Sequence, residues 1–143
     1  MNNNLMLVGG AVVFKRANNG RVDWFLVEEN SKGWEIPKAV VRKGESSVRA
    51  VLRTMGEQAG MSCRVLEEVG RIEDNLEVNG KKTPRRIIYY LVLGRTGGEA
   101  LGFDSSAWLN LNSALKRVSW EKEKMILKKA KLEFEKWLSR QKK

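Results

Sequence analysis

The chain reads GWEIPKAVVRKGESSVRAVLRTMGEQAGM over residues 33–61, where Pro37 and Gly44 favour a loop in the first part. From residue 46 to 59, apolar side chains recur with the i, i+3, i+4, i+7 spacing of one helix face. They are Val48, Val51, Leu52 and Met55. Gly60 then occupies the place where a left-handed cap usually ends a helix. The stretch therefore predicts a loop that leads into an amphipathic helix.

Two strand-forming segments precede this loop. LMLVGGAVVF (5–14) and VDWFLVE (22–28) are rich in β-branched and aromatic residues. The Asn-Asn-Gly sequence at 18–20 separates them and favours a tight turn. The segment from 5 to 28 therefore predicts an antiparallel hairpin, and residues 31–38 predict the loop that follows it.

Four further strands are predicted after the helix. They are CRVLEEVGRI (63–72), a short strand at 76–78 before an Asn-Gly turn, RRIIYYLVLG (85–94), and AWLNL (107–111) at an edge. The third of these is continuously apolar, which is typical of a strand buried on both faces. A glycine-bearing loop at 94–106 precedes the last strand.

The C-terminal part predicts a short helix at 113–117 and a long one after Ser119. Apolar side chains follow one face of the long helix: Trp120, Leu127, Ala130, Phe134 and Trp137. We interpret this stripe as packing onto the sheet rather than as a partner-binding or membrane-binding face. The order of strands, helix, strands and helix predicts the α/β (α+β) class, with a mixed sheet between helices in a single domain, 1–143.

Composition limits the chemistry. The chain has one cysteine, Cys63, and no histidine, so it can form neither an internal disulfide nor a His/Cys metal site. Any metal would be held by oxygen atoms, as Mg²⁺ or Mn²⁺ prefer. No apolar run approaches the roughly 20 residues that cross a bilayer, and no secretion signal is recognisable. We expect a cytosolic (cytoplasmic) protein with no membrane partner.

The chain is strongly basic, with 27 Lys and Arg against 17 Asp and Glu and a net charge of +10. Residues 119–143 carry nine basic residues and four glutamates. The simplest interpretation is a solvated helix face and a basic end. The alternative is a positive field that attracts a polyphosphate or a nucleic acid.

Residues 39–61 resemble the 23-residue box of the Nudix hydrolase family. The matching residues are Glu45, Arg53, Met55, Glu57, Gly60 and Met61. Ala39, Thr54 and Gln58 stand where the family has Gly, Glu and Glu. GGAVVF, WEIPK, IIYYLVL and AWLN also occur in the family's order, and WEIPK most resembles the diadenosine tetraphosphate hydrolase branch. The resemblance implies the Nudix fold.

The substituted positions bear directly on metal binding. Residues 54, 57 and 58 share one face of the predicted helix, where three carboxylates could hold divalent cations against a pyrophosphate. Here Glu57 is the one carboxylate, and Glu57 with the Gln58 amide oxygen predicts weak, substrate-dependent binding of Mg²⁺ or Mn²⁺. The family often adds an acid from a loop after the central strand, which makes Asp104 a candidate; the alternative is a turn-forming Asp.

The resemblance also implies roles for other residues. In the family, the pair at Glu45 and Arg53 forms a salt bridge that braces the loop against the helix. We expect phosphate contacts from the basic residues near the loop and the central strand: Lys38, Arg42, Lys43, Arg85 and Arg86. Trp34 is a candidate for stacking on a nucleobase, with simple packing as the alternative.

We interpret the chain as a Nudix-type protein that binds a nucleotide-like diphosphate or polyphosphate. The missing carboxylates predict a degraded metal site and weak or no pyrophosphohydrolase activity. Two alternatives remain open. The first is an active Mg²⁺- or Mn²⁺-dependent hydrolase of substrates such as dinucleoside polyphosphates, with Glu57 as catalytic residue. The second is a basic RNA-binding or assembly subunit on the same scaffold.

Overall fold

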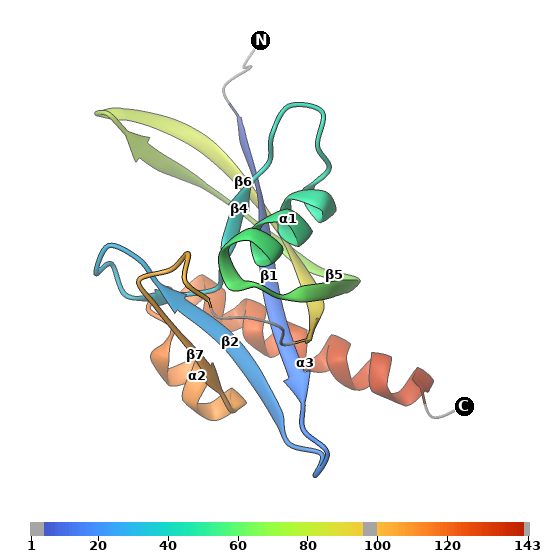
Figure 1. Cartoon of the computed structure of the whole chain (residues 1–143). Helices are drawn as coiled ribbons and strands as arrows, with labels where there is room; N and C mark the ends of the chain where they lie inside the picture. The colour runs from blue at the N-terminus through green and yellow to red at the C-terminus, as the bar shows by residue number, and fades with distance from the viewer. Residues whose placement is uncertain (1–4, 96–99, 142–143) are drawn as a thin grey trace.

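The computed structural model describes residues 5–95 and 100–141. These residues form a seven-stranded mixed sheet and three helices (Figure 1). The strands are β1 (Met6–Arg16), β2 (Val22–Glu28), β3 (Trp34–Glu35), β4 (Lys38–Val40), β5 (Ser62–Val78), β6 (Lys81–Arg95) and β7 (Ser105–Leu109). The helices are α1 (Ser47–Ala59), α2 (Leu111–Arg117) and α3 (Glu121–Gln141). The predicted α/β class with a mixed sheet is confirmed.

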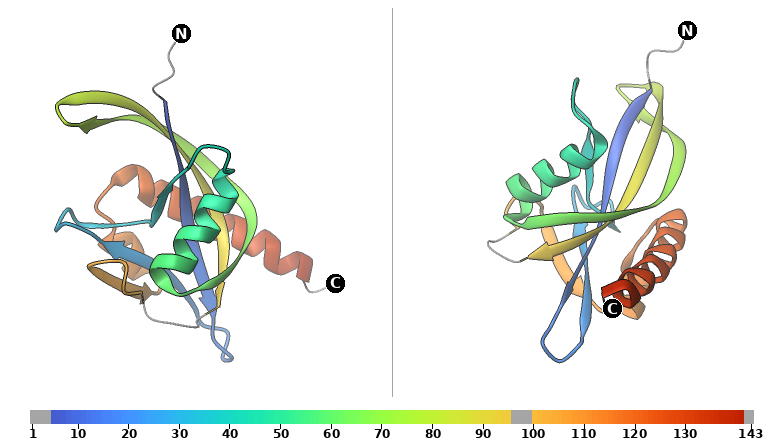
Figure 2. Two further views of the ribbon diagram at one scale, coloured as in Figure 1. Left: turned by 45° about the horizontal axis from the view of Figure 1, so that its top comes forward. Right: turned by 90° about the vertical axis from the view of Figure 1, so that its right-hand side faces the viewer.

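Strands β1 and β6 form the centre of the sheet and run parallel, from the Met6–Arg85 pair to the Phe14–Leu93 pair. The strand order is β3-β2-β1-β6-β5, with β4 paired to β1 and β7 to β2. Helices α1 and α3 lie on opposite faces of this sheet (Figure 2). Because successive residues of a strand point to opposite faces, the sheet has two cores, one under each helix.

The predicted hairpin is confirmed, and so is the helix within residues 39–61, called the box helix below, which is α1. β1 and β2 pair antiparallel. The Ser46 side chain caps the start of α1 by accepting a hydrogen bond from the Arg49 amide, and Gly60 ends the helix with φ of 62°. The predicted apolar face is displaced, however. Val48 and Leu52 are only half-buried. The buried side chains are Ala50, Val51, Thr54, Met55 and Ala59.

Two other predictions differ from the structure. The predicted loop 31–38 contains β3 and the start of β4, which are short and pair with β2 and β1. The two strands expected at 63–72 and 76–78 are one continuous strand, β5, with register shifts on either side of Glu67–Glu68. β5 stays paired with β6 on both sides of these irregular points, so the strand continues past them. Residues 96–99 of the predicted loop 94–106, and Lys142 and Lys143, lie outside the described residues.

Helix α3 packs onto the sheet, as its apolar stripe predicts. Leu127, Ala130 and Phe134 are buried against β1, β2 and β6 residues, and Phe14 contacts Phe134 with ring centroids 4.9 Å apart. One acid, Glu123, is buried in the same stripe. No helix in the described part of the chain is long and apolar enough to cross a membrane.

Candidate functional site

A salt bridge joins the loop before α1 to the helix itself. Arg53 Nε donates to Glu45 Oε2 at 2.8 Å, and Arg53 Nη2 donates to Glu45 Oε1 at 3.0 Å. Arg53 also donates to the Val40 carbonyl, and the Arg42 amide donates to Glu45. Hydrogen bonds from Arg53, and then from the Arg42 amide, lower the pKa of Glu45 to about 2. The loop is therefore fixed to α1 through one charged carboxylate.

The three helix positions that would carry a metal do not form one acidic face. Thr54 is buried with 3% exposure, whereas the Glu57 side chain is 56% exposed and lies 3.9 Å from Arg53. The Gln58 side chain is half-buried. The backbone carbonyl of Gln58 accepts a hydrogen bond from the backbone amide of Gly102 at 2.9 Å. In residues 5–95 and 100–141, no group of three or more acidic or other metal-binding side chains is suitably placed. These residues do not fit a resident divalent ion.

Asp104 has a structural partner in the loop between β2 and β3. Its Oδ2 accepts a hydrogen bond from the backbone N–H of Asn30 at 2.7 Å. Burial raises the pKa of the nearby Glu29, and the charges of Glu35 and Asp104 raise it further. Residues 102–104 thus connect α1, through Gly102, to the β2–β3 loop.

A cavity of about 220 Å³ lies between β3, β6 and the start of α3. Its lining residues are Lys32, Trp34, Glu35, Lys38, Arg85, Ser119, Trp120 and Glu123. Three of the residues chosen from sequence, Trp34, Lys38 and Arg85, are therefore brought together here. Arg42 and Lys43 are exposed in the loop before α1 and do not line the cavity.

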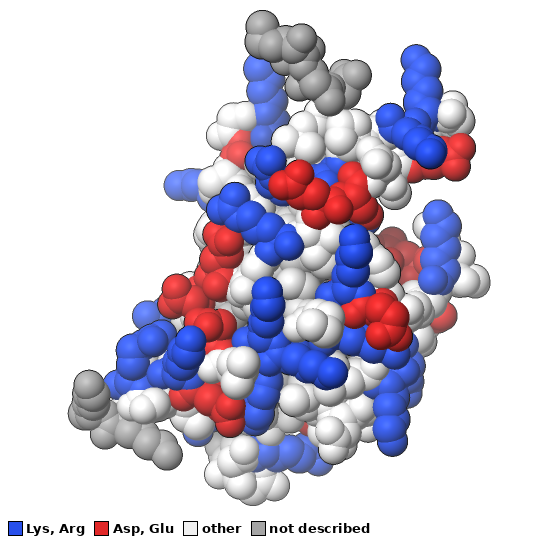
Figure 3. All heavy atoms as spheres, turned by 180° about the vertical axis from the view of Figure 1, so that it is seen from behind, with Lys and Arg blue, Asp and Glu red and all other residues white. Residues whose placement is uncertain are grey.

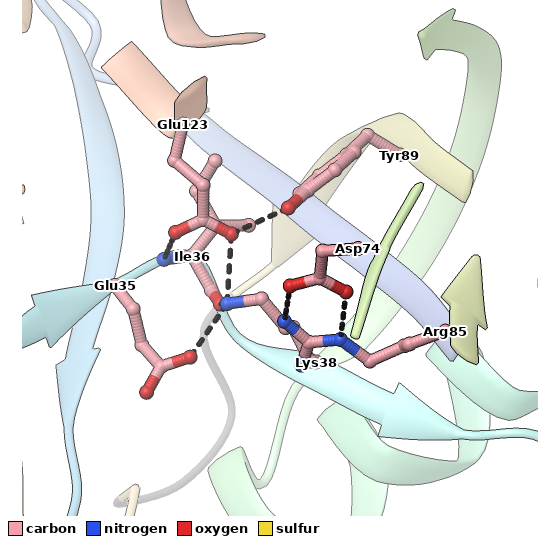
Figure 4. Close-up of polar contacts among 7 residues, drawn as sticks. All are labelled: Glu35, Ile36, Lys38, Asp74, Arg85, Tyr89 and Glu123. Atoms are coloured by element: carbon pink, nitrogen blue, oxygen red, sulfur yellow. Dashed lines mark hydrogen bonds and ion pairs between the residues drawn. The ribbon is translucent and has the colours of Figure 1, made fainter. Parts of the chain in front are cut away.

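A buried carboxylate organises the floor of this cavity (Figure 4). Glu123 has 0% exposure; its Oε1 accepts from the Ile36 amide at 3.0 Å and its Oε2 from the Tyr89 hydroxyl at 2.6 Å. Lys38 Nζ lies 2.7 Å from Glu123 Oε2, 2.9 Å from the Ile36 carbonyl and 2.5 Å from Glu35 Oε1. All three ammonium hydrogens of Lys38 thus have acceptors within the protein. Burial, followed by the Glu123 charge, raises the pKa of Tyr89.

The other basic candidates at the central strand are also paired. Arg85 donates to both Asp74 oxygens, at 2.9 and 2.7 Å, and these hydrogen bonds lower the pKa of Asp74. Its guanidinium also lies 5.8 Å from the ring centroid of Trp120. Arg86 lies outside the cavity lining and donates to Glu73 at 3.2 Å. On the other wall, Trp34 packs against the guanidinium of Arg117 at 5.0 Å.

No role was predicted for Glu35 or Glu123, and Trp120 was predicted only to pack onto the sheet, whereas all three line the cavity. Glu35 has no pattern that distinguishes it from a surface acid. For Glu123 a signal exists, because it fills the one vacant place in the apolar stripe between Trp120 and Leu127. An acid at an apolar position of a packed helix indicates a buried, partnered carboxylate.

Residues 6–129 match the sequence model of the NUDIX domain. The chain belongs to the Nudix family. It is 26% identical over 135 residues to bis(5'-nucleosyl)-tetraphosphatase [asymmetrical] of Sus scrofa, covering 82% of this chain and 88% of that protein. It is 24% identical over 96 residues to a Mycobacterium tuberculosis protein named "Putative mutator protein MutT4"; the match covers 65% of this chain but only 39% of that protein's length.

Solved structures of Nudix proteins have the same fold. The Ap4A hydrolase of C. elegans superposes with a TM-score of 0.70 at 20% identity, covering 94% of this chain and 98% of that one. The NUDIX domain of Shewanella oneidensis NrtR, complexed with ADP ribose, gives a TM-score of 0.72 at 16% identity, with 94% and 90% coverage. The family and fold expected from residues 39–61 are therefore confirmed.

Proposed function

We propose that the protein binds a nucleoside diphosphate derivative and hydrolyses it weakly or not at all. The observation that carries this proposal is the state of the box helix, where Glu57 is the one carboxylate among the three metal-binding positions. Thr54 is turned into the core, and Gln58 is neutral. Two of three formal negative charges are missing, and the attraction for a divalent cation falls accordingly.

The cavity supports binding of the nucleoside end of such a ligand. Trp34 and Trp120 provide flat aromatic surfaces in its wall, on which a base can stack. Its volume, about 220 Å³, is below the roughly 300 Å³ at which pockets for drug-sized ligands begin. The cavity therefore suits one base rather than a whole dinucleotide, and the rest of the ligand extends over the surface.

Of the five basic candidates, Arg42 and Lys43 are the best placed to contact a phosphate. Both are exposed in the loop that leads to the start of α1, where a helix N-terminus adds a favourable dipole. Lys38 and Arg85 already satisfy carboxylates, so either would have to open an ion pair to bind a phosphate. Any Mg²⁺ or Mn²⁺ would then be held mainly by the phosphates, with Glu57 as a single protein ligand.

A turnover screen with Mg²⁺ and with Mn²⁺ tests this proposal. Dinucleoside polyphosphates, nucleotide sugars and nucleoside triphosphates are offered to the protein and to a Thr54→Glu/Gln58→Glu variant. We expect binding but little turnover by the natural chain, and turnover by the variant only if its new carboxylate at position 54 turns out of the core. Efficient turnover by the natural chain that Glu57→Gln abolishes would establish an active hydrolase and overturn the proposal. Absence of any nucleotide binding would overturn it as well.

A second candidate function is nucleic-acid binding along α3. Figure 3 shows that Lys and Arg side chains are spread over the face on which α3 lies, with acids between them. Lys122, Lys128 and Lys129 of α3 are exposed and have no acid within 4.0 Å in the part of the chain that the structure describes. Nucleic-acid binding would weaken steeply with salt, by close to one logarithmic unit in slope per phosphate contact.

A further inference from the structure

Two carboxylates line the cavity, and within the described residues one of them has an oxygen without a hydrogen-bond partner. Glu123 is fully buried and accepts hydrogen bonds from Ile36, Tyr89 and Lys38. Glu35 accepts from Lys38 through Oε1, and its side chain is 37% exposed. Across residues 5–95 and 100–141, its Oε2 has no hydrogen-bond partner. Glu35 is therefore the acceptor that a ligand in the cavity can reach.

Two of the three basic side chains in the lining, Lys38 and Arg85, are largely committed to acceptors within the protein. Lys38 has an acceptor for each of its three hydrogens. Arg85 directs Nε and Nη2 to Asp74. Lys32 remains as an ammonium that can meet an anionic group of a ligand. A flat ring in the cavity thus contacts aromatic surfaces and one anionic acceptor. It binds most tightly if its edge carries N–H donors that point at this acceptor.

Guanine meets this requirement and adenine does not. A carboxylate only accepts hydrogen bonds, and the guanine edge offers two adjacent donors, the ring N1–H and the exocyclic 2-amino group. The corresponding adenine edge places the N1 acceptor beside its amino donor, so one lone pair faces the carboxylate. We propose that Glu35 selects a guanine base in this cavity, and that the ligand is a guanosine diphosphate derivative. This proposal rests on the proposed function.

The preference can be measured on the full chain without metal. GDP, IDP and ADP are titrated separately by isothermal calorimetry. Hypoxanthine, the base of IDP, keeps N1–H but lacks the 2-amino group. We expect GDP to bind about tenfold or more tighter than ADP, because hydrogen bonds to a charged group are among the stronger ones, with IDP between them.

Glu35→Gln tests the residue itself. An amide both donates and accepts, so the ratio of GDP to ADP affinity should fall towards one, mainly through weaker GDP binding. The ratio is the readout, because loosening Lys38 would change the affinity for the diphosphate shared by all three ligands. Glu35→Asp keeps the carboxylate and should keep the preference for GDP. Glu29→Gln removes the same charge from a neighbouring carboxylate outside the lining and should leave the ratio unchanged.

The results separate the two proposals. Equal affinities for the three nucleotides, or an unchanged ratio in Glu35→Gln, would overturn selection by Glu35 and leave nucleotide binding intact. If none of the three nucleotides binds, the proposed function fails and selection by Glu35 fails with it.

Discussion

Glu123, in the first turn of α3, lies 2.7 Å from the ammonium of Lys38, in the strand that leads into the box loop. The pair is buried, since the two side chains are 0% and 13% exposed. The backbone N–H of Ile36, just before Pro37, donates a hydrogen bond to the same carboxylate. The C-terminal helix therefore fixes the position of a segment that the sequence places far away.

Glu123→Ala should strongly destabilise the protein. The substitution leaves the Lys38 charge and the Tyr89 hydroxyl without their buried partner, which typically costs about 3–5 kcal/mol. Urea unfolding monitored by circular dichroism gives the free energy of unfolding. Glu121→Ala is the matched control, because that side chain is 85% exposed in its ion pair with Lys124 and should matter little. Equal effects of the two substitutions would show that the buried cluster contributes nothing.

Acid should selectively remove the contribution of the box-loop salt bridge. The Glu45 pKa is lowered from 4.5 to about 2 in the folded protein, so the stabilisation is complete above pH 4.5 and is lost as the pH falls towards 2. The difference in unfolding free energy between the natural protein and Glu45→Gln should be constant near neutrality and shrink over that window. Urea titrations at a series of pH values measure it. Parallel stability curves down to about pH 2 would contradict this role.

Gly102→Ala should displace the segment that covers Gln58. A Cβ at Gly102 would lie 2.5 Å from the Gln58 Cβ and 2.7 Å from its Cα, so the segment has to move away from α1. We expect a loss of about 1–3 kcal/mol in unfolding free energy.

Gly56→Ala is the control for this change, since it is an exposed position within α1 with nothing closer than 3.9 Å. There alanine should stabilise the helix by about 0.5–1 kcal/mol. Thermal unfolding distinguishes the two substitutions by the sign of the shift, and a gain at both positions would refute the steric argument.

Thr54→Glu alone should reduce stability by about 2 kcal/mol or more, because it places a carboxylate at a position with 3% exposure. Burial raises the pKa of a carboxylate, so the loss should grow as the pH rises and lessen in acid. Gln58→Glu, at a half-buried position, should cost less. Unfolding with and without Mg²⁺ measures both effects. Equal stability of Thr54→Glu and the natural protein at neutral pH would mean that Thr54 can turn to solvent.

The features that sequence predicted well depend on local signals. The β1–β2 hairpin follows from a turn at 18–20 between two apolar runs, and α1 follows from its period, Ser46 and Gly60. The resemblance to the Nudix box at 39–61 is also a local pattern. Such features need no knowledge of what lies elsewhere in the chain.

The features that sequence missed depend on distant partners. β3 and β4 are too short to have a period of their own, and they exist because β2 and β1 offer open edges. Thr54 is buried because α1 is rotated relative to the face inferred from Val48 and Leu52. Lys38 forms ion pairs with Glu35 and Glu123. Predicting the second pair requires knowing where α3 packs, which no local sequence pattern provides.

The parallel pairing of β1 with β6 has a consequence for synthesis of the chain. β2 and β4 pair with one edge of β1, and β6 pairs with the other edge, from Met6 to Phe14. During translation the hairpin and α1 emerge first, and that edge stays open until Lys81–Arg95 has left the ribosome. Open apolar edges invite pairing between chains. Nascent chains should therefore be most prone to aggregation after the hairpin and α1 have emerged and before Lys81–Arg95 has left the ribosome.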